Sequence, residues 1–434
     1  MEQELNMKNE ISRRQFVEKM AWGCLGVSAL PSLGNAAQII PTAKGEHYGK
    51  AKNIIYIFLN GGASHLDTWD YKENPKANGG IKPSVLPTGE KISQYFPELA
   101  KHGDKFSIIR SMTSKNGSHE GGSYLMKTSY PRNGLTIHPT LGSLRFWLKE
   151  DKEKSIPDYV TILGNANSSE GYLDKKFGPL SILNPNEGVK FSKASVENSI
   201  FNKRVETLKA LDGKFRKQYN IADVNNYSIV YDEALKLMQS KDLGAFDLNK
   251  ESPADRDRYG RSTFGQACLL AKRLVKNNIG MVELNEGGWD MHNDIGDNMQ
   301  RKSEYFDKAI AALFEDLAKE GLLKTTLVVI TTEFGRTVDV SGAHNNNGLN
   351  QNSGRDHAPG AFSSIVGGLD LGGKVVGKTD EFGAKVVDRP VTINDFNSTL
   401  GHLMGINPEY VWMAPSINRP FTIGNKGHIV PEFA

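Results

Sequence analysis

The sequence predicts an α/β fold with a mostly parallel central sheet, and three observations support this prediction. Apolar runs of strand length recur along the chain, segments with helical spacing separate them, and each run is apolar throughout. Continuous apolar strands are typical of a sheet that helices cover on both faces, because neither face then meets water. We therefore expect three layers, with the sheet in the middle.

The predicted strands and helices alternate along the chain. Residues 54–59 form a continuous apolar run that stops at a Gly-rich turn, which indicates a buried strand. Residues 264–275 keep helical spacing, and a second strand is predicted at 280–284. A long helix with one apolar face covers 306–317, and the β-branched run 327–332 is a third strand. This alternation favours parallel strands joined by helices.

Residues 183–260 differ from the rest of the chain, because they are polar, rich in Lys and Asn, and weak in helical periodicity. We interpret them as a helical insertion or cap on an α/β domain that spans residues 45–430. A chain of 434 residues has room for one large domain of this kind.

The sequence of residues 1–37 is typical of an export signal. Residues 12–16 read Ser-Arg-Arg-Gln-Phe, a twin-arginine core, and a modestly apolar stretch at 20–33 follows it. Small residues at 34–37 offer a cleavage region, whereas the residues before Cys24 make a poor lipoprotein signal. The alternative is a chance Arg-Arg pair before a buried helix. We expect a periplasmic or secreted protein, exported folded by the twin-arginine route.

Composition and charge exclude several classes of protein. Lys and Arg number 53 against 50 Asp and Glu, so the net charge is only +3 and no basic stripe predicts nucleic-acid binding. No apolar run approaches 18 residues, so we expect no transmembrane span. Two cysteines are too few for a disulfide framework or a zinc ribbon.

Polar side chains that suit a metal follow the predicted strands. In open α/β sheets, functional groups collect beyond the carboxyl ends of the strands. Asp290 and His292 come after the strand at 280–284, and His357 lies about 65 residues further on, before another apolar run. Carboxylate oxygen and imidazole nitrogen suit zinc, iron or manganese, and three protein ligands with an open position are typical of a catalytic metal.

Several motifs, spread in order over residues 50–410, resemble a known family. They are Phe-Leu-Asn-Gly-Gly-Ala-Ser-His-Leu-Asp-Thr-Trp-Asp at 58–70, Arg-Ser-Met at 110–112, Gly-Gly-Trp-Asp-Met-His at 287–292, Thr-Glu-Phe-Gly-Arg-Thr at 332–337 and Gly-Arg-Asp-His at 354–357. Together they resemble the exported proteins grouped as domain of unknown function 1501, a family placed in the alkaline phosphatase and sulfatase superfamily. The resemblance implies an alkaline-phosphatase-like three-layer sandwich. It says less about activity, because the family itself lacks a settled reaction.

The resemblance implies one intact and one altered metal site. The intact set is Asp290, His292 and His357. At the second site the superfamily's first-strand Asp is replaced by Asn60, although Asp67 is a substitute ligand to consider. Two further ligand positions of that site are also altered, since Glu333 stands in place of Asp and Phe334 in place of His or Asn.

The superfamily's nucleophile position falls on a histidine. Counting back nine residues from Thr128 reaches His119, whose role as nucleophile, general base or additional ligand stays open. Arg336 and Arg110 are candidates to hold an anionic group through their planar donor forks. The predicted catalytic residues are thus His119, Glu333 and Arg336, and the candidate metal ligands are Asp290, His292, His357, Glu333 and Asp67.

Three functions are compatible with these predictions. The first is a hydrolase of phosphate or sulfate esters that uses one divalent metal, with zinc preferred over iron or manganese. The second is a non-catalytic envelope protein that binds an anionic ligand, a glycan or an exported partner protein. A mutase or nucleotide-modifying enzyme is the third, but no Gly-rich phosphate loop supports it.

Overall fold

The computed structural model describes residues 45–434 except 152–153, 165–166, 191, 193, 219–221, 339–352 and 416. All of them belong to the unit Thr42–Ala434. The signal predicted at residues 1–37 lies outside the described residues, so export stays a prediction.

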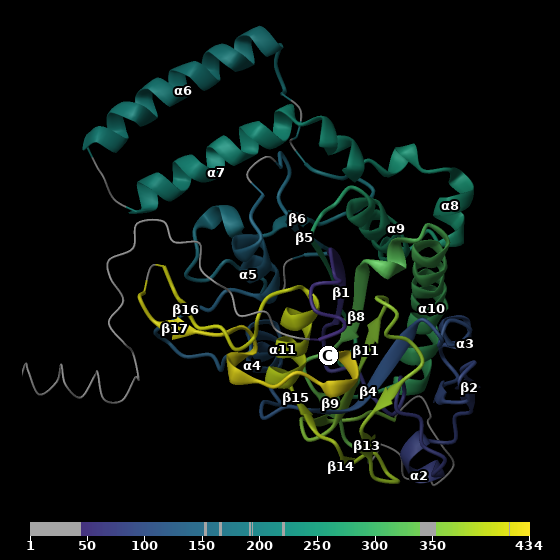
Figure 1. Cartoon of the computed structure of the whole chain (residues 1–434). Coiled ribbons are helices and arrows are strands. Elements are labelled where there is room, and N and C mark those ends of the chain that lie inside the picture. Colours follow the sequence, from purple (N-terminus) through teal and green to yellow (C-terminus); the bar gives the residue numbers. More distant parts are fainter. Residues whose placement is uncertain are drawn as a thin grey trace, which may run out of the picture. The chain divides into compact units, whose positions relative to one another are not determined.

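A nine-stranded sheet forms the centre of the described residues (Figure 1). Its main path, in spatial order, is β12 (Val375–Val376), β4 (Phe106–Thr113), β11 (Phe362–Gly367), β8 (Thr326–Thr331), β1 (Asn53–Leu59), β7 (Met281–Glu286), β5 (Tyr159–Ile162) and β6 (Leu180–Ile182). β15 (Val391–Thr392) pairs with β4 off this path. Every pairing is parallel except the two made by β11, which runs opposite to β4 and β8. The sheet is therefore mostly parallel, as predicted, with one reversed strand.

Helices cover both faces of this sheet, and β1 shows how the two faces differ. Ile55, Ile57 and Leu59 point into a core shared with α9 (Thr263–Lys276) and α10 (Ile295–Lys319). The alternate residues 54, 56 and 58 enter a second core with residues of α4 (His119–Thr128), α5 (Leu141–Leu148) and α11 (Ile393–Leu403). Figure 1 shows these two sets of helices on opposite sides of the strands. The predicted three-layer α/β arrangement is confirmed.

The predicted elements correspond to observed ones, with small shifts at most ends and one large one: α10 begins at Ile295, eleven residues before the predicted start at 306. The strands predicted at 54–59, 280–284 and 327–332 are β1, β7 and β8. The helices predicted at 264–275 and 306–317 are α9 and α10.

Within the region 183–260, α6 (Asn198–Gln218) and α7 (Ala222–Gln239) run alongside each other above the sheet in Figure 1. The 3-10 turns η2 (Lys241–Phe246) and η3 (Leu248–Lys250) and the short helix α8 (Pro253–Arg258) follow them. This region is helical, and its role as an insertion or cap stays a prediction.

The remaining elements are short and surround the sheet. They are α2 (Pro75–Asn78), α3 (Pro97–Ala100), β2 (Pro83–Val85), β3 (Lys91–Ser93), β9 (Gly335–Arg336), β10 (His357–Ala358), β13 (Lys378–Thr379), β14 (Val386–Asp388), β16 (Trp412–Met413), β17 (Pro420–Phe421), η1 (Lys175–Phe177), η4 (Leu322–Lys324), η5 (Ile423–Lys426) and η6 (Pro431–Phe433).

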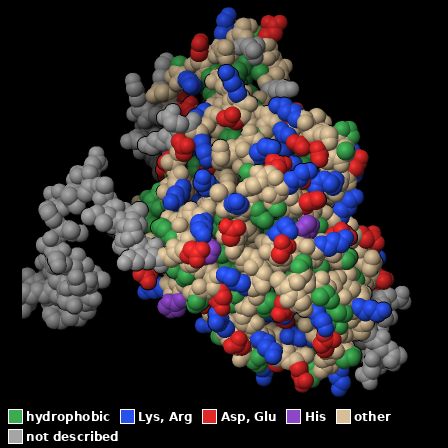
Figure 2. All heavy atoms as spheres, turned by 45° about the vertical axis from the view of Figure 1, so that its right-hand side comes forward, with side chains coloured by type: hydrophobic (Ala, Val, Ile, Leu, Met, Phe, Trp, Pro, Cys, Tyr) green, Lys and Arg blue, Asp and Glu red, His purple; other side chains and the backbone are tan. Residues whose placement is uncertain are grey.

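The surface carries both signs of charge. On the face shown in Figure 2, the Lys and Arg side chains are interspersed with Asp and Glu. Among the described residues, no helix combines the length and the apolarity needed to cross a membrane.

Candidate metal centre

The candidate site lies at one edge of the sheet, where the ends of several strands meet. The carboxyl ends of β1, β7, β8 and β4 share this edge because these strands run in the same direction. Asp290 follows β7, Glu333 follows β8, and His119 begins α4 after β4. His357 precedes β11, and because β11 is reversed, its amino end reaches the same edge. The reversed strand thus explains how a residue before a strand joins residues that follow strands.

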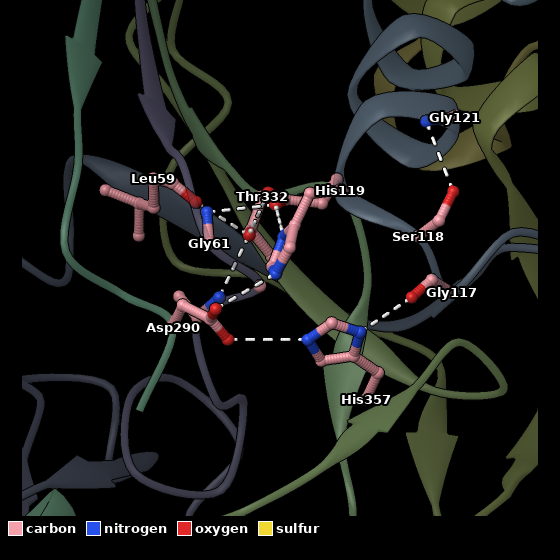
Figure 3. A network of polar contacts seen from close by, with 12 residues as sticks. Leu59, Gly61, Gly117, Ser118, His119, Gly121, Asp290, Thr332 and His357 are labelled. Carbon is pink, nitrogen blue, oxygen red and sulfur yellow. Dashed lines mark hydrogen bonds and ion pairs between the residues drawn. The ribbon is translucent and has the colours of Figure 1, made fainter. Parts of the chain in front are cut away.

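Three imidazole groups converge on the Asp290 carboxylate. His119 Nε2 lies 3.1 Å from Asp290 Oδ2, and His357 Nε2 lies 3.4 Å from Asp290 Oδ1. His292 Nε2 lies 2.8 Å from the same Oδ1. Figure 3 shows His119 and His357 pointing toward Asp290 from different elements. One ligand atom each from His119, Asp290 and His357 can be chosen so that all lie within 4.8 Å of one another, a spacing that a single ion can bridge.

The second nitrogen of each imidazole is held by an oxygen. His119 Nδ1 contacts Glu333 Oε1 at 2.9 Å, and His292 Nδ1 contacts Asp356 Oδ1 at 2.9 Å. His357 Nδ1 donates to the Gly117 carbonyl at 2.8 Å. The Nε2 atoms face the Asp290 carboxylate, which also only accepts, so a proton on Nε2 fits these contacts when no cation is bound. With a cation on Nε2, each ring would instead carry its proton on Nδ1 and donate it to the oxygen there. Metal-binding histidines characteristically donate their other ring N–H to such oxygens.

The cluster faces solvent, whereas its supports are buried. The side chains of His119 and Asp290 are 37% and 43% exposed, but Glu333 is fully buried. Glu333 accepts a hydrogen bond from Gly61 N at 2.9 Å and contacts Thr332 Oγ1 at 3.0 Å. An open ligand set on a rigid buried support is typical of a catalytic rather than a purely structural metal site.

Arg336 orients Asp290 and is itself fully occupied. Its side chain is buried, Nε donates to the Gly62 carbonyl at 2.7 Å, and its terminal nitrogens contact the Gly61 and Arg355 carbonyls, Asp290 Oδ1 at 2.5 Å and His292 Nε2 at 3.4 Å. These contacts account for all five N–H donors of a guanidinium. Arg336 therefore reaches the site but has no free donor for the anionic group that we predicted it to hold.

Charge at the site follows from these contacts. Partial burial raises the pKa of the Asp290 carboxyl, but the hydrogen bond and charge of Arg336, with help from His357 and His119, lower it to about 2. Asp290 is therefore ionised at neutral pH. The hydrogen bond to Glu333 raises the pKa of His119, against the opposing effect of its partial burial.

Phe334 packs where the resemblance expects a ligand. The ring is fully buried, and its centroid lies 5.3 Å from that of His119 and 4.6 Å from that of His357. The residue thus holds two imidazoles in place by packing and has no ligand atom to offer a second cation.

A glycine allows the turn after β1 to approach the site closely. Gly61 has a φ of +122°, and a Cβ placed there would lie 2.5 Å from Asp290 N. Only glycine adopts this conformation without strain and leaves that space open.

Two candidates lie outside the cluster. Asp67 is fully buried and pairs with the fully buried Arg355 at 2.7 Å, while Ser64 donates to it at 2.5 Å. Arg110 contacts Glu90 at 2.9 Å and two backbone carbonyls. The structure therefore brings together His119, Asp290, His292, Glu333, Arg336 and His357, and it places Asp67 in a buried ion pair.

Sequence reasoning missed two supports of the cluster. Asp356, the partner of His292, lies beside His357 in the Gly-Arg-Asp-His motif, so its position was a usable signal. The Gly117 carbonyl that holds His357 is a backbone group, and the side-chain pattern carries no information about it.

The fold and the site together define an α/β protein with a candidate single-metal centre at the carboxyl edge of its sheet. The chain belongs to the family described as protein of unknown function (DUF1501), whose model matches residues 51–434. The resemblance found in the motifs is thereby confirmed. No curated protein matches the chain.

Solved structures similar to this chain include members of the alkaline phosphatase and sulfatase superfamily. The lipoteichoic acid synthase LtaP from Listeria monocytogenes matches with 12% identity and a TM-score of 0.35, over 86% of this chain and 77% of its own. The PsFucS1 sulfatase from Pseudoalteromonas sp. matches with 12% identity and a TM-score of 0.38, over 88% of this chain and 75% of its own. Alkaline phosphatase from the Antarctic bacterium TAB5 matches with 12% identity and a TM-score of 0.33, over 77% of this chain and 96% of its own.

Proposed function

We propose that this protein is a hydrolase of phosphate or sulfate esters that depends on one divalent metal held by His119, Asp290 and His357. One observation carries the proposal: imidazole Nε2 atoms converge on an ionised carboxylate while an oxygen holds each Nδ1. A cation in place of the protons between the Nε2 atoms and the carboxylate would keep the Nδ1 hydrogen bonds, an arrangement characteristic of metal-binding histidines.

The spacing of the donor atoms supports a small divalent ion. Ligands about 2.0–2.1 Å from a tetrahedral ion lie about 3.3 Å from one another. His119 Nε2 lies 3.1 Å from Asp290 Oδ2 and His357 Nε2 lies 3.4 Å from Asp290 Oδ1, each close to that value although to different oxygens of the carboxylate. Two imidazoles and one carboxylate suit zinc best, with iron or manganese as alternatives.

A cation bound there would supply a Lewis acid that activates water and polarises an ester oxygen. His292 is the fourth candidate donor, but its Nε2 also meets Arg336 Nη1 at 3.4 Å, and that positive charge opposes a cation. We therefore give His292 a positioning role, because its Nδ1 contacts Asp356 Oδ1 and its Nε2 contacts Asp290 Oδ1 at 2.8 Å. Glu333 keeps the Nε2 lone pair of His119 directed at the ion, and Arg336 keeps Asp290 in position.

One observation favours the non-catalytic alternative. Ser118, next to the nucleophile position, uses its hydroxyl to cap α4 through Gly121 N and to contact Asn116. Together with the occupied donors of Arg336, this leaves metal and water as the source of any reactivity. A protein that only binds an anionic ligand, a glycan or an exported partner would need the same metal but no turnover. The predicted twin-arginine signal would deliver either protein to the periplasm.

The test is the metal content of the mature, folded protein, measured by elemental mass spectrometry. We expect about one zinc, iron or manganese per chain, and its loss in an Asp290→Ala/His357→Ala variant. Asp257→Ala/His428→Ala is a matched control, because both of these side chains are exposed and lie outside the cluster.

Activity on aryl phosphate and aryl sulfate esters then separates hydrolase from binding protein. We expect turnover that a chelator abolishes and added metal restores. A wild-type protein without metal above the level of the double variant would refute the proposal. Metal without turnover on either ester would favour the non-catalytic alternative.

A further inference from the structure

A cavity borders α4, the helix that begins at His119 of the candidate metal centre. It has a volume of about 210 Å³ and opens between α4, the segment 132–138 and the loop 167–169 that follows β5. Because that loop follows the carboxyl end of β5, the cavity lies at the same edge of the sheet as the metal centre. We call it the Tyr124 pocket, after the side chain of α4 that lines it.

Helix α4 connects the pocket to the metal centre. The helix begins at His119, and its residues Glu120 and Tyr124 line the pocket. With a rise of about 1.5 Å per residue, Tyr124 lies about 7.5 Å along the helix from His119. Residues five apart also project about 140° apart around the helix, so a substrate that occupies both places has to pass around the side of α4.

The pocket presents a hydrogen-bond donor without a partner. The Tyr124 hydroxyl accepts from His138 N at 2.7 Å, so its own proton is free for His138 Nδ1 at 2.9 Å. A ring that accepts at Nδ1 carries its proton on Nε2. That Nε2–H makes no hydrogen bond to any residue that the structure describes. Burial also lowers the pKa of His138, which keeps the ring neutral at neutral pH.

The pocket is polar but has no net charge. Among the described residues that line it, the charged side chains are Arg132 and Glu120, and they pair with each other. The other polar lining groups are the hydroxyls and amides of Asn133, Thr136, Asn167, Ser168 and Ser169. Some of these groups are already bonded within the protein, since Ser168 Oγ donates to Glu283 at 2.7 Å and Asn133 Oδ1 accepts from Thr136 N at 2.8 Å. A charged ligand finds no unpaired opposite charge among the described lining residues, while the amide N–H groups of Asn133 and Asn167 and the hydroxyl of Thr136 can bind a neutral, hydroxyl-rich one.

Aromatic packing makes the wall of the pocket rigid. His138 stacks on Tyr130 with ring centroids 4.2 Å apart and planes 4° from parallel, and Tyr172 meets His138 edge-on at 6.0 Å. A rigid wall keeps donors and acceptors in position and lowers the entropic cost of binding. The volume is below the roughly 300–1,000 Å³ of sites for drug-sized ligands, so the pocket suits one ring rather than a chain.

We propose that the Tyr124 pocket binds the uncharged, hydroxyl-rich part of the ester, a single sugar ring, while the metal centre holds the charged group. The inference rests on the proposed function for the reaction itself. Binding of the sugar ring, however, requires only the pocket. The experiment therefore measures sugar binding rather than turnover.

Saturation-transfer difference NMR with methyl glycosides of glucose, galactose and N-acetylglucosamine tests the proposal on the mature protein. Ile137 lines the pocket and is 65% exposed, so Ile137→Trp fills the space with little risk to the fold. Leu183→Trp is the matched control, since Leu183 is 64% exposed and lies outside the pocket. We expect saturation transfer to at least one glycoside in the wild type and in the control, and its loss in Ile137→Trp.

The outcome is independent of the metal. We expect His357→Ala, which removes a proposed ligand, to keep the sugar signal, so a failure of the hydrolase proposal leaves this result intact. Absence of saturation transfer to all three glycosides in the wild type would overturn the inference. Equal signals in Ile137→Trp and the wild type would also overturn it, because the sugar would then bind elsewhere.

Discussion

Replacing Glu333 by Gln removes one charge beside the metal centre and keeps the hydrogen bonds. In the wild type, Glu333 Oε1 accepts from Gly61 N and from His119 Nδ1, both at 2.9 Å, and Oε2 contacts Thr332 Oγ1 at 3.0 Å. An amide oxygen can take the place of Oε1, and the amide nitrogen can donate to Thr332 Oγ1. The Thr332 hydroxyl then donates to the Leu59 carbonyl, 2.8 Å away. The variant therefore tests the charge alone.

The size of the effect follows from the strength of one hydrogen bond. A hydrogen bond to a charged group contributes about 1.5–3 kcal/mol, and a neutral one about 0.5–1.5 kcal/mol. The difference of about 1–1.5 kcal/mol corresponds to metal binding that is about five- to thirteen-fold weaker. At other metal sites, variants of residues that support a ligand lose about 10–100-fold in metal affinity. This range overlaps the five- to thirteen-fold loss obtained from the hydrogen-bond energies.

Competition with a zinc chelator measures this loss as a change in Kd. We expect Glu333→Gln to bind zinc about tenfold more weakly than the wild type, with a similar melting temperature of the metal-free protein. Glu315→Gln, an exposed carboxylate on α10, controls for loss of charge as such. An unchanged Kd in Glu333→Gln, combined with lost binding in His119→Ala, would refute the role given to the carboxylate.

Two further predictions concern groups outside the metal centre. Asp67→Asn breaks the buried pair with Arg355, so we expect the free energy of unfolding in urea to fall by about 3–5 kcal/mol, with unchanged metal per folded chain; lost metal with full stability would contradict this. Burial raises the pKa of Asp307 to about 6, despite hydrogen bonds from the backbone N–H groups of Leu99 and Glu98. The folded state then binds more protons than the unfolded state, whose carboxyl has a pKa of about 3.9, so stability falls as the pH rises from about 4 to about 6, by up to about 3 kcal/mol. Urea unfolding at pH 4 and pH 7 should show a larger fall in the wild type than in Asp307→Asn, and equal falls would refute the assignment.

The fold was largely predictable because its central strands are buried on both faces. The runs that became β1, β7 and β8 are apolar at every position, a pattern that stands out in a single sequence. The reversal of β11 was not predictable, because an apolar run has no direction. Strand direction depends on the connections before and after the run, which the pattern does not contain.

The candidate site was predictable in its residues but not in its geometry. The rule that functional groups follow parallel strands led to Asp290 and Glu333, and the family resemblance added His119. That Arg336 would be saturated by backbone carbonyls could not be predicted, because the loop conformations that bring these carbonyls to it leave no pattern in the side chains. Asp67 has the same chemistry as a ligand, and only the fold shows that it faces Arg355.

The position of β11 in the sheet has a consequence for folding order. β11 lies between β4 and β8 and pairs with both, although it follows β4 by about 250 residues in the chain. Until this late segment inserts, two edges of the sheet remain open, and contacts between such distant residues form slowly. His357 lies just before β11, so one of the proposed metal ligands arrives only with the last strand to enter the centre of the sheet. Binding of the ion would then require a complete sheet. We expect a chain truncated before residue 357 neither to complete the sheet nor to bind the ion.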